Sequence, residues 1–245
     1  MSGKIQNSMF LQFLKHPFST GAVCASSPSL CGEMVGCPCF RNARSIAELG
    51  PGTGAVTECI LSALPAGADF FAVELNENLV QHLQKRFPGL AVYNESAENL
   101  KQIIAGRGVD SLDAVISSLP WTIFPGDLQE RLLDAVWDVM SDNGLFVTYM
   151  YVQGAIMPSG IQFRRRLAKK FGNVERSPII WKNMPPDQMS SPSSGLVWVI
   201  APSGYLIPTE ESPLSPLFLP QEARRANDKI KTKTKTKIFF IKSSF

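Results

Sequence analysis

The feature that most limits the fold is a glycine-rich break between an apolar run and a helix-like segment. Residues 44–61 read RSIAELGPGTGAVTECIL, with glycine at three alternate positions after the run Ser45–Leu49. A glycine loop between a strand and a helix lets a ligand approach the backbone at the helix N-terminus. We therefore expect Gly50, Gly52 and Gly54 to border a ligand. The simpler alternative is a tight turn that needs glycine only for its backbone angles.

Strand-like and helix-like segments alternate over residues 44–155, which favours an α/β fold with a doubly wound, mostly parallel, seven-stranded sheet and helices on both faces. The expected strands are Ser45–Leu49, Phe70–Glu74, Ala91–Tyr93, Ala114–Ser117, Leu145–Tyr149, Glu175–Trp181 and Leu196–Ala201. The expected helices are Ala55–Leu64, Asn78–Phe87, Ala97–Ala105, Leu128–Met140 and the basic segment Gln162–Phe171. Asp142-Asn143-Gly144 is a turn signal that would end the fourth helix. Ligands of such sheets bind at the carboxyl ends of the strands.

Composition divides the chain into three parts. Residues 1–43 are expected to form a helical cap, and Phe10, Phe13 and Leu14 on one helix face make a membrane-contact segment equally plausible. Residues 44–201 form the main domain. Residues 202–245 combine a proline-rich linker with a basic, low-complexity tail.

The net charge of +3 is unevenly distributed along the chain. Residues 221–245 hold eight Lys/Arg and two acidic side chains, whereas the remainder holds sixteen basic and nineteen acidic ones. An acidic body is a poor surface for nucleic acid, so we expect no nucleic-acid partner. The chain has neither a secretory signal nor an apolar run long enough to span a bilayer, which predicts a cytoplasmic location without a transmembrane segment.

The five cysteines do not indicate a disulfide framework or a metal site. Their number is odd, and the one close pair, in Cys37-Pro38-Cys39, has no matching second pair. We expect reduced thiols and no metal.

Glu74 narrows the class of ligand. It ends the second expected strand, twenty residues after Gly54, where an acidic side chain accepts hydrogen bonds from ribose hydroxyls in folds of this kind. The glycine loop lacks the Gly-Lys-Ser/Thr ending of a phosphate cradle, so a nucleoside is expected rather than a pyrophosphate. A strand-end carboxylate that simply faces water is the alternative.

Together, ELGPGTG at residues 48–54 and the acidic residue Glu74 resemble the class I S-adenosylmethionine-dependent methyltransferases. The resemblance implies S-adenosylmethionine as the cofactor, with the glycines near its methionine part, Glu74 at the ribose and the segment after the third strand at the adenine. Ser96 stands where the family usually has aspartate, and Ala97 keeps its place. The implied cofactor-binding residues are Glu48, Gly50, Gly52, Gly54, Glu74, Ser96, Ala97 and Ser117.

The sequence SSLPW at residues 117–121 bears on the substrate. It looks like the corresponding segment of bacterial phospholipid N-methyltransferases and of related ornithine-lipid enzymes. The stretches FLKHPFSTGAVCASSPSLCGEMV and IIWKNMPP are similar to two further segments of that family. The resemblance implies methylation of an amino headgroup such as that of phosphatidylethanolamine, with Ser117, Pro120, Trp121 and Tyr151 as candidate catalytic residues.

Methyl transfer to an amine needs a nitrogen lone pair held in line with the methyl group, so positioning and desolvation supply much of the catalysis. We therefore expect a monomeric phospholipid N-methyltransferase, peripheral to the inner face of the membrane. Two alternatives are an RNA adenine N6-methyltransferase, whose family has asparagine before Leu-Pro-Tyr, and a cofactor-binding protein without catalysis.

Overall fold

Five apolar segments form a parallel sheet in the order β3-β2-β1-β4-β5. In the computed structural model, which describes residues 28–36, 40–176 and 195–201, every residue of β1 is buried. A strand covered on both faces needs such a continuous apolar run. The bounds are β1 Ser45–Leu49, β2 Asp69–Val73, β3 Ala91–Tyr93, β4 Leu112–Ser117 and β5 Met140–Tyr151.

Two antiparallel strands continue the sheet beyond β5. Strand β7 (Gly195–Ala201) pairs with β5, and β6 (Asn173–Arg176) pairs with β7. The chain divides into two compact units, Met1–Thr209 and Glu210–Phe245, and all described residues lie in the first.

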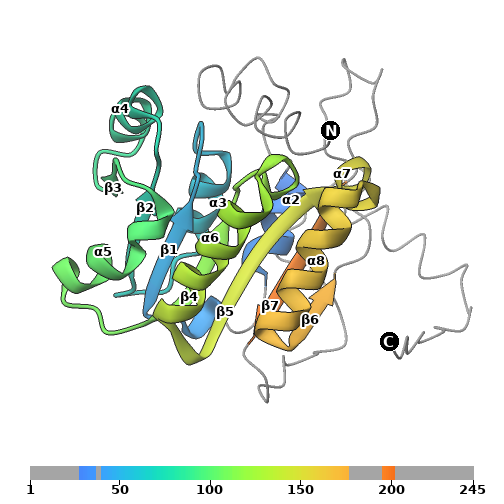
Figure 1. Ribbon diagram of the computed structural model, residues 1–245. Helices are drawn as coiled ribbons and strands as arrows, with labels where there is room; N and C mark the ends of the chain where they lie inside the picture. Colours follow the sequence, from blue (N-terminus) through green and yellow to red (C-terminus); the bar gives the residue numbers. More distant parts are fainter. Residues whose placement is uncertain (1–27, 37–39, 177–194, 202–245) are drawn as a thin grey trace, which may run out of the picture. The chain divides into compact units, whose positions relative to one another are not determined.

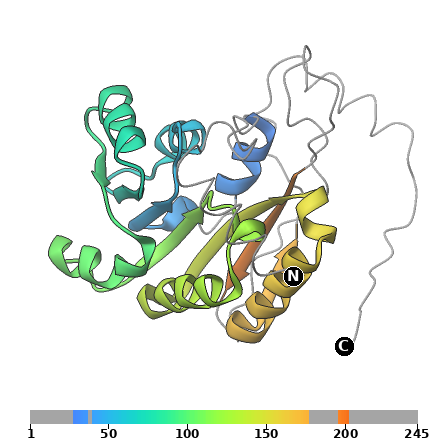
Figure 2. The same cartoon turned by 45° about the horizontal axis from the view of Figure 1, so that its top comes forward.

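Helices cover both faces of the sheet, as Figures 1 and 2 show. Because neighbouring residues of a strand point to opposite faces, Ile46 lies in one core cluster and Ala47 in the other. Helices α2 (Pro28–Val35) and α3 (Ala55–Ala63) contribute to the cluster around Ile46. The cluster around Ala47 includes side chains of α5 (Leu100–Arg107), α6 (Gly126–Val139) and α8 (Pro158–Phe171). The doubly wound α/β fold predicted from the sequence is confirmed.

The remaining elements are short or lie at the rim of the sheet. They are α4 (Glu77–Arg86), α7 (Val152–Ile156) and the 3-10 helices η1 (Phe40–Asn42), η2 (Ala97–Asn99) and η3 (Trp121–Ile123). Helix α7 was not expected from the sequence, and the helix expected over residues 97–105 begins as the 3-10 turn η2 before α5. The predicted basic helix starts earlier than expected, at Pro158.

The turn predicted at Asp142-Asn143-Gly144 is wrong. Helix α6 ends at Val139, and β5 begins at Met140 and runs through these residues. Met140 pairs with Leu112, and the register then shifts before Leu145 pairs with Ala114, so the turn-favouring residues form an irregular start to the strand. Gly144 is needed there, because a Cβ would stand 2.8 Å from the Leu112 carbonyl oxygen.

Several expectations fall outside the described residues. They concern the N-terminal helix, the Cys37-Pro38-Cys39 pair, the segment IIWKNMPP and the tail from residue 202. Over the ranges that the structure does describe, no helix has the length and apolar character needed to span a membrane.

Candidate active site

The candidate site lies where three neighbouring strands end. Strand β1 pairs with β2 on one side and with β4 on the other, so Leu49 lies beside both Val73 and Ser117. The glycine loop after β1, Glu74 after β2 and the Ser-Leu-Pro-Trp segment after β4 therefore meet at one edge of the sheet. Most candidates from the sequence lie on these three segments, while Ser96 and Ala97 follow β3 and Tyr151 ends β5.

Gly52 borders open space at this edge. Its φ is +60°, and among the described residues, its two chain neighbours apart, no atom lies within 4 Å of the position that a Cβ would occupy. Its amide donates a hydrogen bond to Glu74 Oε2 over 3.2 Å. A side chain at Gly52 would both strain the backbone and enter the space beside Glu74.

The other two glycines of the loop are required by packing within the protein. A Cβ at Gly50 would stand 2.7 Å from Leu119 Cδ2, and one at Gly54 would stand 2.6 Å from Phe87 Cε2. The loop is thus pressed between the segment after β4 and the residue that follows α4. Arg86 adds a hydrogen bond of 2.7 Å from its Nη1 to the Thr53 carbonyl oxygen. Contact of the Gly50 and Gly54 backbones with the cofactor stays a prediction.

Glu74 is buried but has acceptor capacity left. Its Oε1 accepts from the Asn76 amide at 2.9 Å, and its Oε2 accepts from the Gly52 amide. Burial raises the pKa of Glu74, and hydrogen bonds from the backbone amides of Asn76, Gly52 and Leu75 oppose that rise. Each carboxylate oxygen can accept a second bond, so the side chain fits the ribose hydroxyls predicted for it.

Glu48 lies inside the protein below the loop. It is fully buried, and its Oε2 accepts a hydrogen bond of 2.7 Å from Thr57 Oγ1 on α3. Burial raises the pKa of this carboxyl to about 8, so it is a neutral acid at pH 7. Within the described chain its Oε1 has no hydrogen-bond partner. The contact made here joins β1 to α3, and the cofactor contact predicted for Glu48 stays a prediction.

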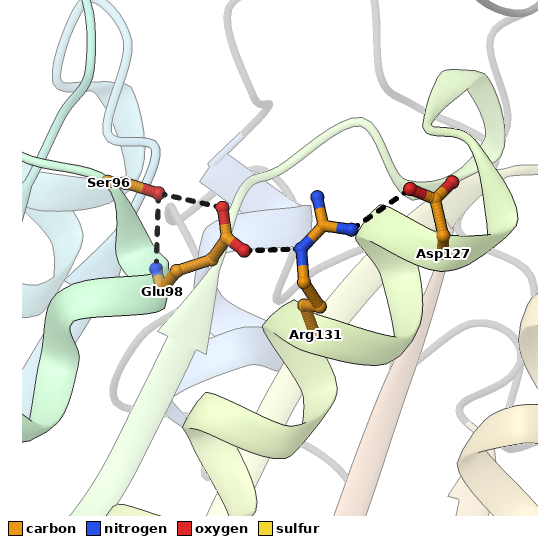
Figure 3. A network of polar contacts seen from close by, with 4 residues as sticks. All are labelled: Ser96, Glu98, Asp127 and Arg131. Carbon is orange, nitrogen blue, oxygen red and sulfur yellow. Dashed lines mark hydrogen bonds and ion pairs between the residues drawn. The ribbon is translucent and has the colours of Figure 1, made fainter.

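Ser96 and Ala97, predicted at the adenine, lie at the start of η2. The Ser96 hydroxyl caps this turn by accepting from the Glu98 amide at 3.2 Å, and it also contacts the Glu98 carboxylate. Figure 3 shows that Arg131 on α6 donates hydrogen bonds to the carboxylates of Glu98 and Asp127. The network holds the segment after β3 against α6. The adenine contacts predicted for Ser96 and Ala97 stay predictions.

Ser117 and Trp121 are both buried in the described part of the chain. The Ser117 hydroxyl accepts from the Trp121 indole Nε1–H at 3.1 Å and from the Leu119 amide at 3.3 Å. The Trp121 ring stacks on Phe163 with 4.7 Å between ring centroids. Half-buried Pro120 immediately precedes η3. These contacts position the segment, and the substrate contacts predicted for Ser117, Pro120 and Trp121 stay predictions.

Ser118 is a further candidate, which the sequence reasoning did not choose as a site residue. Its Oγ is buried without a hydrogen-bond partner among the described residues, while its amide donates to the Leu49 carbonyl at 2.9 Å. The available signal was its position directly before Leu119-Pro120, which asparagine occupies in the related Asn-Leu-Pro-Tyr motif.

Two tyrosines end β5 beside this segment. Strand β5 pairs with β4, so that Thr148 lies opposite Ser117 and Tyr151 follows three residues later. The rings of Tyr149 and Tyr151 meet edge to face, with 5.8 Å between centroids. Both side chains are half-buried. An aromatic pair of this kind can attract an ammonium group, although the substrate contact of Tyr151 stays a prediction.

Known proteins share the fold of this chain. No family model matches the chain. The ornithine lipid N-methyltransferase of Singulisphaera acidiphila is 28% identical over 183 residues, covering 65% of this chain and 95% of the relative. The O-methyltransferase from Bacillus cereus, in complex with SAH, has a TM-score of 0.54 at 12% identity over 79% of this chain and 90% of that one. TomG, an O-methyltransferase from Streptomyces achromogenes in complex with SAM, has a TM-score of 0.53 at 16% identity over 81% and 90%.

These similarities confirm the resemblance on which the sequence analysis relied. The structural neighbours share the fold, and the relative shares a sequence similarity that covers nearly its whole length. The open space at Gly52 beside a carboxylate with unused acceptor capacity fits a ribose-bearing cofactor.

Proposed function

We propose that this chain, an S-adenosylmethionine-dependent methyltransferase, methylates the primary amine of a phospholipid headgroup such as that of phosphatidylethanolamine. The lipid N-methyltransferase relative and the Ser-Leu-Pro-Trp segment support this substrate class. The proposed domain is 44–201, with residues 1–43 as a cap and 202–245 as a tail. We further infer that the protein acts as a monomer at the inner face of the membrane.

The observation that carries the proposal is the contact between Leu119 and Gly50. The Leu119 side chain occupies the space where a Cβ of Gly50 would be. Residues 117–121, here called the substrate segment, therefore contact residues 50–54, here called the cofactor loop. The next residue back, Ser118, has a buried hydroxyl with no partner in the described chain. A nitrogen held by this hydroxyl would therefore lie close to the cofactor edge of the sheet, as in-line transfer requires.

S-adenosylmethionine supplies an electrophilic methyl group on a positively charged sulfur. After the headgroup ammonium has released one proton to solvent, the Ser118 hydroxyl is proposed to accept a hydrogen bond from the neutral amine, which orients the nitrogen lone pair. Tyr149 and Tyr151 form an aromatic wall that favours the cationic product. The buried aromatic cluster of Trp121, Phe124, Phe146 and Phe163 holds the Ser-Leu-Pro-Trp segment in place.

Transfer of labelled methyl groups tests the proposed substrate. The full chain is incubated with labelled S-adenosylmethionine and with phosphatidylethanolamine vesicles, ornithine-lipid vesicles or total RNA. We expect label in an aminolipid. Label in RNA alone would overturn the proposal, and cofactor binding without any transfer would identify a non-catalytic binding protein.

Ser118→Ala tests the proposed orienting group. We expect kcat to fall about tenfold, the loss typical of one hydrogen bond to a reacting group, while the affinity for S-adenosylmethionine stays unchanged. Ser62→Ala is the control, because the exposed Ser62 hydroxyl on α3 donates to the Glu58 carbonyl, one turn earlier on the same helix. Equal kcat values for the two variants would remove Ser118 from the mechanism.

A further inference from the structure

An apolar tip projects from the rim of the candidate site. It consists of Ile156, Met157 and Pro158, which join α7 to α8, and all three are exposed. Ile156 is 73% exposed and Met157 is 49% exposed, although both side chains are strongly apolar. Exposed apolar groups gathered at one point mark an interaction surface more often than scattered ones do.

The tip is held firmly beside the substrate segment. A Cβ at Gly160 would stand 2.1 Å from the Gly154 carbonyl oxygen, so α7 and α8 touch backbone to backbone. A Cβ at Gly154 would stand 3.0 Å from Thr122 of η3, the short helix that begins with Trp121. The chain therefore presents the exposed Ile156 and Met157 from a fixed support that contacts η3, directly after the Ser-Leu-Pro segment.

One exposed face of α8 continues from the tip and carries two cations, Arg165 and Lys169. Pro158, Gln162, Arg165 and Lys169 follow one another at intervals of four, three and four residues, and all are exposed, so they share one face of the helix. No ion pair of Arg165 or Lys169 is found among the described residues. Their neighbours Arg166 and Lys170 instead pair with Glu130 and Asp134 of α6.

We propose that the tip and the cations Arg165 and Lys169 form a membrane-docking surface whose partner is an anionic lipid bilayer. Ile156 and Met157 would enter the boundary between headgroups and acyl chains, while the two cations meet anionic headgroups. This inference rests on the proposed function, because it explains how a bilayer lipid is brought to the Ser-Leu-Pro segment. A protein partner is disfavoured, because a stable protein interface buries about 800 Å² on each side and the apolar tip holds three residues.

Vesicle co-sedimentation of the full chain tests the docking surface directly. The probes are vesicles of phosphatidylcholine alone and of phosphatidylcholine mixed with phosphatidylglycerol. We expect Ile156→Ser combined with Met157→Ser to weaken partitioning into the mixed vesicles about tenfold. Leu61→Ser is the matched control, because Leu61 is a 36% exposed apolar residue on α3, and it should bind like wild type.

Arg165→Gln combined with Lys169→Gln separates the electrostatic contribution. This variant should lose binding only to the vesicles that contain phosphatidylglycerol, and added salt should abolish its difference from wild type. Unchanged partitioning of the Ile156/Met157 variant would overturn the proposal. Equal loss in the Leu61→Ser control would overturn it as well, since the effect would then belong to any exposed apolar residue.

An activity assay distinguishes this proposal from the proposed function. Phosphatidylethanolamine dispersed in detergent micelles does not require docking on a bilayer, so the Ile156/Met157 variant should methylate it at the wild-type rate. Loss of activity on micelles as well as on vesicles would place the tip in the substrate site and overturn the docking role. If wild type binds vesicles through the tip but methylates no lipid, the proposed function fails and the docking surface stands.

Discussion

The two sides of the candidate site are built from different kinds of chemical group. On the cofactor side, backbone groups and carboxylates meet: the Gly52 amide binds Glu74, and Arg86 binds the Thr53 carbonyl. On the substrate side, aromatic rings dominate, with Trp121 packed among Phe124, Phe146 and Phe163. A single side chain, Leu119, presses one side against the other at Gly50.

The difference teaches which side tolerates variation. A loop of fixed backbone groups can bind the same cofactor whichever methyl acceptor is used. We therefore expect few substitutions to be tolerated in this loop. A packed aromatic cluster can support different substrate-contacting side chains without changing its own packing. The predictions below test whether the two sides are separable, beginning with the largest expected effect.

Trp121→Ala should be the most damaging change, because it opens a cavity in the buried aromatic cluster around Trp121. We expect the free energy of unfolding to fall by about 3–5 kcal/mol, as for other buried tryptophans. Trp137→Ala is the matched control, since Trp137 is 36% exposed on α6 and should cost about 1 kcal/mol. Urea denaturation measures both. Full stability with lost activity would make Trp121 a substrate contact instead of a support.

Gly52→Val should affect the cofactor side alone. A valine there adopts a strained positive φ and enters the open space beside Glu74, so affinity for S-adenosylmethionine should fall about 100-fold, or about 2.7 kcal/mol. Calorimetric titration measures the loss. Gly67→Val is the control, because Gly67 also has a positive φ and open space but lies in the turn that precedes β2. Equal affinities in the two variants would mean that the cofactor does not use this loop.

The buried carboxyl of Glu48 should make the stability of the folded protein depend on pH. Its pKa is about 8 in the folded protein against an ordinary 4.5, so the folded state keeps a proton that the unfolded state releases between these values. Stability from this group is complete below the unfolded pKa and is lost as pH rises through 8.

Between about pH 6 and pH 8 we expect the free energy of unfolding of the cofactor-free protein to fall by about 2 kcal/mol. Glu48→Gln should remove that part of the slope, which denaturation curves at several pH values would reveal. Parallel pH profiles for wild type and variant would contradict the raised pKa.

Arg86→Ala should have the smallest effect. The ion pair of Arg86 with Glu58 is largely exposed, so stability should change by less than about 1 kcal/mol. Release of the Thr53 carbonyl should nevertheless weaken S-adenosylmethionine binding about threefold, or about 0.7 kcal/mol. Glu58→Ala removes the ion pair but keeps the carbonyl contact. If it weakened binding equally, the ion pair would be what supports the loop.

The same contrast explains how much the sequence could predict. The bounds of β1 and β3 were predicted to the residue, and the glycine loop and Glu74 follow from a local pattern. The turn at Asp142-Asn143-Gly144 failed because strand pairing between Met140 and Leu112 overrides local turn chemistry. Pairing partners are distant in sequence, so one short pattern does not reveal them.

The site shows the same limit. Spacing alone could not tell that Gly54 faces Phe87 while Gly52 faces open space, because the packing of α4 decides it. Nor could it tell that the Ser117 hydroxyl accepts the Trp121 indole N–H while the Ser118 hydroxyl has no such partner among the described residues. Side-chain partners across elements were the missing information in both cases.

The close backbone contact between Gly154 and Gly160 has a kinetic consequence. Two helices that touch backbone to backbone have no room to hinge, so the rim beside the substrate segment cannot act as a lid. If the proposed lipid substrate enters at this rim, we expect the slow steps of turnover to be its arrival and departure along the bilayer. Their rates should follow the fluidity of the membrane and not a conformational change of α7 and α8.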